Sequence, residues 1–78
     1  MFYTYILRST SKNKYYYGST ANLRTRLKQH NQGKVKSTKG LRPLVLHYYE
    51  IFQTKKEAII RERFFKSIDG YNFLRSKN

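Results

Sequence analysis

Three stretches of the chain carry the residue pattern of β-strands. Residues 2–9 (FYTYILRS) and 15–19 (YYYGS) are rich in aromatic and β-branched side chains, as are residues 44–52 (LVLHYYEIF). In the first stretch Tyr3, Tyr5 and Leu7 share one face, and Phe2, Thr4 and Ile6 share the other. Both faces are partly apolar, so we expect this strand to lie at the centre of its sheet.

Polar and glycine residues mark where helices begin and end. Asn22 is a plausible N-cap for a helix over residues 23–31, and Gly33 is a plausible C-terminal stop. Thr54, with Glu57 three residues later, forms a capping box that opens a second helix over residues 55–67. The dipeptide at 69–70, Asp-Gly, ends that helix, and residues 71–77 are expected to form a short third helix.

The first helix is expected to turn a specific set of side chains toward the sheet. At 100° per residue, Leu23, Leu27 and His30 fall on one arc, with Arg26 at its edge. Arg26 and His30 are therefore neighbours one turn apart, directed toward the tyrosines of the sheet. The cationic side chains expected to point into solvent are those of Arg24 and Lys28.

The order of elements is β-β-α-β-α-α, which predicts an α+β fold with a small three-stranded antiparallel sheet flanked by helices. Residues 1–78 are expected to form one domain, since this length is near the lower limit for a single core. Pairing across a five-residue loop at 10–14 is expected to set Tyr3 and Tyr5 opposite Tyr15 and Tyr17. Residues 34–42 are expected to form a polar, basic loop with almost nothing to bury.

The net charge of the chain indicates what kind of partner it binds. Seventeen Lys and Arg against four acids give a formal charge of +13, which favours a polyanionic partner. Nucleic acid is the first candidate partner and an anionic membrane the second. Membrane binding would need a helix with an apolar face free for lipid, and each predicted helix needs its apolar face for the core. The chain has no cysteine and no apolar run of about 18 residues, and its first residues resemble a strand more than a signal peptide. We expect a reducing compartment such as the cytoplasm.

A few side chains could carry chemistry. Of the four acids, Glu57 caps a helix, Asp69 belongs to a turn and Glu50 can sit on a strand surface. Glu62 falls on the apolar arc of its helix, where an ionised carboxylate needs a partner. Either a neighbouring arginine pairs with it, or the helical wheel is wrongly phased at this position, or it holds a Mg²⁺ that keeps most of its waters and takes further ligands from substrate phosphate.

The tyrosines, His30 and Arg26 each have an ordinary explanation as well. Most of the eight tyrosines are expected to pack in the core or on the sheet, and a helix-end histidine is usually a cap or half-buried. A phenol is a poor base unless cations lower its pKa from about 10. Arg26 and a metal on Glu62 could do so. The residues alone leave these alternatives open.

Two short motifs, followed by these helices, resemble a GIY-YIG nuclease domain. The first motif stands here as Tyr3-Thr4-Tyr5 and the second as Tyr16-Tyr17-Gly18. The segments NLRTRLKQHN and EAIIRERFFK resemble the family's following helix and its later acidic helix. The likeness runs from about residue 2 to residue 66 and is greatest to the small stand-alone, YhbQ-like group. Tyr3 stands in place of the family's first glycine, and Thr4 and Tyr17 in place of its usual aliphatic residues.

The resemblance implies a site and a reaction. Tyr5 and Tyr16 correspond to the motif tyrosines, Arg26 to the arginine on the scissile phosphate, His30 to a polar residue one turn later, and Glu62 to the single metal ligand. It implies a Mg²⁺- or Mn²⁺-dependent endonuclease, with DNA favoured over RNA and repair or recombination as the setting. The alternatives are a silent nucleic-acid-binding module of the same fold and an RNA- or ribosome-associated protein. The side chains expected to contact the nucleic-acid backbone are Arg24, Lys28, Lys34, Lys36, Lys39 and Arg42.

Overall fold

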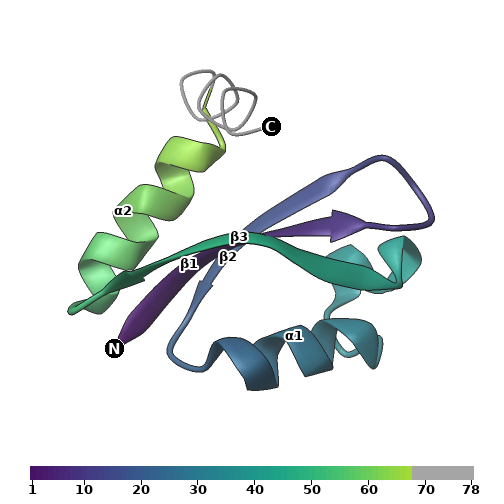
Figure 1. Cartoon of the computed structure of the whole chain (residues 1–78), viewed down its shortest axis with the longest axis horizontal. Helices are drawn as coiled ribbons and strands as arrows, with labels where there is room; N and C mark the ends of the chain where they lie inside the picture. The colour runs from purple at the N-terminus through teal and green to yellow at the C-terminus, as the bar shows by residue number, and fades with distance from the viewer. Residues whose placement is uncertain (68–78) are drawn as a thin grey trace.

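A computed structural model describes residues 1–67, in which an antiparallel sheet separates two layers of helix (Figure 1). The sheet contains β1 (Phe2–Ser9), β2 (Tyr15–Thr20) and β3 (Leu44–Phe52) in the order β2-β1-β3. Helix α1 (Leu23–Asn31) and the 3₁₀ helix η1 (Lys36–Leu41) lie on one face, and α2 (Lys55–Phe65) lies on the other (Figure 1).

The α+β class, the three-stranded antiparallel sheet and the order of elements through α2 are confirmed. The predicted turn at 69–70 and the predicted helix at 71–77 lie outside the described residues. No helix within residues 1–67 is long and apolar enough to cross a membrane.

The helix ends follow from the predicted caps. The Asn22 side chain accepts a hydrogen bond from the Thr25 amide at 3.0 Å, and Gly33 leaves α1 with a φ of +79°, a conformation that glycine adopts without steric cost. At α2, Thr54 and Glu57 form the reciprocal capping box, with the Glu57 amide donating to Thr54 Oγ1 at 3.2 Å. Local chemistry therefore fixes where both helices start.

The core lies on both faces of β1, as expected for a central strand. Tyr5 and Leu7 pack toward α1 with Leu44, whereas Ile6 packs toward α2 with Phe65. Each large apolar side chain buried in this way contributes about 1.5–3 kcal/mol.

The register of the hairpin differs from the expected one. Arg8 pairs with Tyr15 across the loop, so Tyr5 lies opposite Gly18 and not opposite Tyr17. The expectation that Tyr3 and Tyr5 face Tyr15 and Tyr17 was wrong, because loop geometry and not aromatic matching sets hairpin register. A glycine therefore lies across from Tyr5, and its missing side chain leaves room for the Tyr5 ring.

The basic segment at 34–42 is also more ordered than expected. It contains η1, in which Thr38 is 0% exposed, and Leu41 packs against the core on the α1 side. The expectation that this segment has almost nothing to bury was wrong. A threonine hydroxyl can be buried when it finds a hydrogen-bond partner, and a partner is present here.

Candidate active site

The Tyr5 ring lies directly over Gly18 on the adjacent strand. A Cβ atom placed on Gly18 would lie 2.5 Å from Tyr5 Oη and 2.6 Å from Tyr5 Cζ, far inside normal contact distance. Tyr5 itself is 1% exposed. The absence of a side chain at position 18 therefore allows the phenol to reach from β1 across β2.

His30 holds the Tyr5 hydroxyl from the α1 side. Its Nε2 lies 2.9 Å from Tyr5 Oη, and its Nδ1 lies 2.7 Å from Thr38 Oγ1. The ring centroid of Tyr16 is 5.0 Å from that of His30 and 6.4 Å from that of Tyr5. Three predicted site residues, Tyr5, Tyr16 and His30, are thus brought together, although they come from two strands and a helix.

Burial decides the protonation of this cluster. Burial lowers the pKa of His30 from 6.5 to about 4, and the positive charge of Arg26 lowers it further in the same direction. Burial raises the pKa of the Tyr5 phenol from 10.0 to about 12, against hydrogen bonding from Arg26, which favours the phenolate. At neutral pH both groups are therefore uncharged. His30 is 0% exposed, so it cannot touch an attacking water directly.

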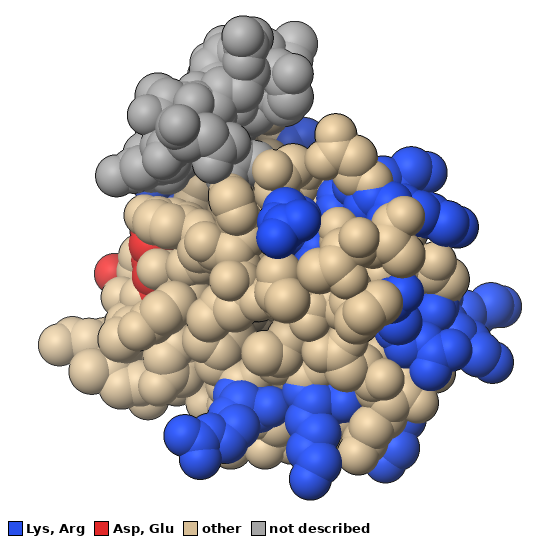
Figure 2. Space-filling view, turned by 45° about the vertical axis from the view of Figure 1, so that its right-hand side comes forward, with Lys and Arg blue, Asp and Glu red and all other residues tan. Residues whose placement is uncertain are grey.

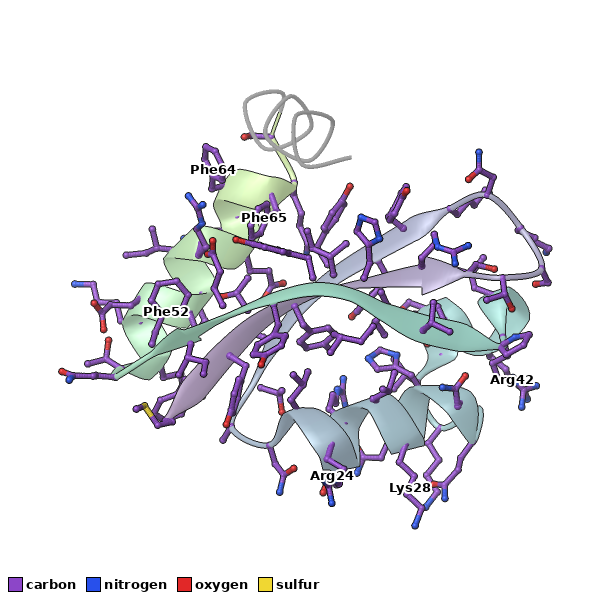
Figure 3. All side chains as sticks on the ribbon, in the orientation of Figure 1. Arg24, Lys28, Arg42, Phe52, Phe64 and Phe65 are labelled. Atoms are coloured by element: carbon purple, nitrogen blue, oxygen red, sulfur yellow. The ribbon has the colours of Figure 1, made fainter. Side chains whose placement is uncertain are left out.

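Arg26 lies on the flank of α1 that faces this cluster. Its side chain is half-buried, donates to Gln29 Oε1 at 3.3 Å and lies close enough to Tyr5 to act on the phenol by hydrogen bonding and by charge. Arg24 and Lys28, in contrast, are exposed and point away from the sheet (Figure 3). The wheel assignment of these three residues is confirmed.

Glu62 lies on α2, on the other face of the sheet, and contacts β2 at Ser19. Its Oε1 accepts a hydrogen bond of 2.8 Å from Ser19 Oγ, and Ser19 directly follows Gly18, on which the Tyr5 ring lies. Since β2 is an outer strand of the described sheet, groups from both faces can meet around it. The negative charge of Glu62 helps raise the pKa of Tyr5, as expected for a nearby carboxylate.

The partners of Glu62 differ from the arginine considered in the sequence. Lys66 Nζ lies 2.8 Å from Glu62 Oε2, one helical turn away, and Ser19 holds the other oxygen. The remaining described acids are engaged elsewhere: Arg61 binds Glu50 through two nitrogens at 2.7 and 3.2 Å, and Glu57 belongs to the capping box. Glu62 is therefore the described carboxylate that contacts β2, at the residue next to Gly18.

A divalent cation at this place would need ligands from outside the protein. Among residues 1–67 no group of three or more His, Cys, Asp or Glu side chains could hold a metal ion. A single carboxylate that is partly exposed suits Mg²⁺, which keeps several waters and takes one or two carboxylates plus substrate phosphate. The donor at Glu62 fits that mode of binding.

The expected nucleic-acid contacts are exposed and lie near η1 and α1. Lys34, Lys36 and Lys39 are exposed on the segment after α1. Arg42 is exposed too, but its Nε donates to the Lys39 carbonyl at 2.8 Å. Figure 2 shows Lys and Arg along the lower and right-hand sides of the molecule, with acidic atoms confined to the left. Exposed cations therefore come from more than one element.

Three residues of the site were not recognised in the sequence. Lys66 lies four positions after Glu62, so helical spacing could have indicated it. Ser19 could have been found only with the correct register, which places it on the α2 face beside Gly18. Nothing in the sequence indicated that Thr38 is buried at the site, because it stands in a lysine-rich segment that resembles a solvated loop.

The sequence is similar to several known proteins. The model of the GIY-YIG catalytic domain matches residues 1–71. The chain is 44% identical over 71 residues to a UPF0213 protein of Bacillus licheniformis, covering 90% of this chain and 72% of that one. It is 42% identical over 69 residues to a UPF0213 protein of Clostridium perfringens, covering 87% of this chain and 73% of that one.

A third relative is the UPF0213 protein YazA of Bacillus subtilis, 46% identical over 57 residues, which are 72% of this chain and 58% of that one. No solved structure matches the chain. The expected resemblance to the small YhbQ-like group is confirmed. The chain belongs to the GIY-YIG family, whose catalytic domain has a nuclease-type fold.

Proposed function

We propose that this protein is a metal-dependent endonuclease that hydrolyses phosphodiester bonds in nucleic acid, with DNA as the expected substrate. The observation that carries the proposal is the meeting of Tyr5, His30 and Glu62 around one strand, β2. The family supports a nuclease-type fold, and the formal charge of +13 suits a polyanionic substrate.

Exposure supports different roles for the two tyrosines. Tyr16 is half-buried, so a water molecule can reach it, whereas Tyr5 is enclosed between Gly18 and His30. In this proposal Tyr16 acts as the general base that takes a proton from the attacking water. The hydroxide adds to phosphorus, and the bond from phosphorus to the 3′-oxygen breaks opposite it.

Arg26 acts on the phosphate, and Tyr5 acts through Arg26. The Arg26 guanidinium binds the non-bridging oxygens, on which negative charge develops in the transition state. Tyr5 is 1% exposed and lies beside Arg26 with its oxygen held by His30, so in this proposal it positions the Arg26 guanidinium and does not contact the phosphate itself. The exposed lysines at 34, 36 and 39 contact the backbone without reading the bases.

Glu62 is the residue that would hold Mg²⁺ or Mn²⁺, and Lys66 must then leave its Oε2. When bound, such an ion stabilises negative charge on the leaving oxygen. Ser19 keeps the carboxylate oriented in either state, because it donates to the other oxygen.

A cleavage assay tests the proposal on supercoiled plasmid and on single-stranded, nicked and branched DNA and RNA. Cleavage by the intact chain is expected with Mg²⁺ or Mn²⁺ and is expected to stop with EDTA. Glu62→Gln removes the metal ligand and keeps the hydrogen bond to Ser19, so it should bind substrate without cutting. Metal-independent cutting, or equal cutting by this variant, would refute the proposed role of Glu62.

One observation favours a second candidate, a silent nucleic-acid-binding module. The ammonium group of Lys66 already pairs with the carboxylate that a metal would need, at 2.8 Å. Such a module binds nucleic acid with the same steep salt dependence but does not cut it with any metal. The same substrate panel separates the two candidates.

A further inference from the structure

An open apolar groove lies between α1 and β3. Its apolar walls are formed by Leu27 of α1, Tyr3 of β1, and Leu46, Tyr49 and Ile51 of β3. The groove has a volume of about 580 Å³, and ligand-binding clefts have about 300–1,000 Å³. We infer that it binds an unpaired base of a nucleic-acid strand, whose phosphates lie along the cations of α1. The inference rests on the proposed function only in taking nucleic acid as the partner.

An exposed aromatic ring forms part of the groove. Tyr49 is 46% exposed and Ile51 is 51% exposed. In the register of β1 and β3, Tyr3 pairs with Ile51 and is therefore a diagonal neighbour of Tyr49. The ring centroids of Tyr3 and Tyr49 are 6.3 Å apart, at an interplanar angle of 55°. An aromatic surface of this kind, beside aliphatic side chains, is one on which any base can stack.

The charges beside the groove are positive. Arg24 lines it, and Lys28 is exposed one turn further along α1, with both side chains on the solvent side of that helix (Figure 3). The first turn of α1 contains no acidic residue, so no carboxylate there offsets the positive end of the helix dipole. A phosphate backbone that runs along α1 therefore meets only favourable charges from this helix.

The acids of residues 1–67 lie on another element or are turned toward it. Glu57 and Glu62 belong to α2, on the opposite face of the sheet (Figure 1). Glu50 belongs to β3, but its carboxylate binds Arg61 of α2 at 2.7 Å. None of these acids lines the groove. The apolar walls therefore lie in a cationic environment, which suits the base of a polyanionic strand.

Other occupants fit this environment less well. A second copy of the chain would bring another charge of +13 against the same cations. A lipid surface is broad and cannot enter a groove, whereas a single base can. In a duplex the faces of each base are covered by its neighbours, so the base that enters must be unpaired.

The groove and the proposed cleavage site lie on opposite flanks of α1. Arg26 lies beside Tyr5, whereas Arg24 lines the groove, and the two arginines are about 160° apart around the helix. A helix with its side chains is about 10–12 Å wide, so the bound base and the cleaved phosphate belong to different nucleotides of one strand. The inference therefore specifies a substrate with an unpaired nucleotide near the cut.

A pair of strands with equal charge tests the contact with the base. Binding of the intact chain is measured in EDTA to a short oligothymidine and to an abasic strand of the same length. We expect the oligothymidine to bind more tightly by about fivefold to a hundredfold, the effect of stacking one base on an aromatic ring. Equal affinities for the two strands overturn the inference.

Variants locate the contact in the groove. Tyr49→Leu removes the ring but keeps an apolar side chain, and Tyr49→Phe keeps the ring. Ile60→Ala provides the control, because Ile60 is 56% exposed on α2, on the opposite face. We expect Tyr49→Leu to lose the preference for oligothymidine while its affinity for the abasic strand is unchanged, and the other two variants to keep the preference. An unchanged preference in Tyr49→Leu, or an equal loss for both strands, overturns the inference.

NMR provides a second measurement if Tyr49→Leu does not fold. Nuclear Overhauser contacts between the thymine methyl groups and the Tyr49 ring are expected in the complex of the unaltered chain, with Tyr49→Phe assigning the signals. Their absence overturns the inference. Sedimentation of the free chain tests the other occupant: a dimer that Tyr49→Leu dissociates, with binding of oligothymidine unchanged, identifies a second copy in the groove and overturns the inference.

These measurements do not depend on cleavage, because EDTA removes the metal. A chain that prefers the base-bearing strand but cuts nothing with any metal loses the proposed function and keeps the groove as a base-binding site. A chain that cuts but binds the two strands equally keeps the proposed function and loses this inference.

Discussion

Replacing Gly18 by alanine tests the contact that shapes the site. The new Cβ would lie 2.5 Å from Tyr5 Oη and 2.6 Å from Tyr5 Cζ, whereas ordinary contacts between such atoms are about 3.5–4.0 Å. The phenol or β2 must therefore move by about 1 Å. Tyr5 is 1% exposed and bonded to His30, so it has no free space to enter. Overpacking of this kind costs about 1–3 kcal/mol.

Gly40→Ala provides the matched control, because a Cβ there meets nothing within 4 Å. Thermal unfolding should show Gly18→Ala melting below the parent by about 4–8 °C for each kcal/mol lost, with Gly40→Ala close to the parent. A displacement of 1 Å at the site should also slow cleavage about a hundredfold under single-turnover conditions. Equal melting and equal cleavage of the two alanine variants would show that Tyr5 does not lie against Gly18.

Three further predictions concern charge. Lys66→Met frees Glu62 Oε2, so Mn²⁺ affinity measured by calorimetry should rise, and unchanged affinity would mean that the ion pair does not compete. The pKa of His30 is lowered to about 4 in the fold, so the unfolded chain takes up the proton first as pH falls. Stability should be full above pH 6.5 and decline toward pH 4, by as much as about 3 kcal/mol, in urea titrations. His47→Gln should keep this decline, and a variant lacking His30 that kept it would contradict the assignment. Lys36→Gln should make the salt dependence of nucleic-acid binding shallower by about one unit of slope, and an unchanged slope would remove Lys36 from the interface.

The parts of this fold that could be predicted from the sequence are those set by local chemistry. Asn22, Gly33 and the capping box at Thr54 and Glu57 act within four residues of their partners, so the sequence contains both halves of each interaction. The wheel of α1 likewise separated Arg26 from the exposed cations, because helical periodicity depends on spacing alone.

What could not be predicted depended on contacts between distant residues. The register that sets Tyr5 against Gly18 follows from loop geometry, and aromatic residues on both strands gave no way to choose it. The burial of Thr38 depends on His30, eight positions earlier and on another element. Composition in that segment, with lysines on both sides, indicated solvent instead.

The central claim is that one phosphate meets groups from both faces of the sheet around β2. Cleavage and binding measured on the same samples of Arg26→Ala, Glu62→Gln and the unaltered chain test it most directly, with Mg²⁺ present and folding checked by melting. The account predicts that both variants bind the substrate nearly as the unaltered chain does and that neither cuts it. Cutting by either variant at the rate of the unaltered chain would contradict the account.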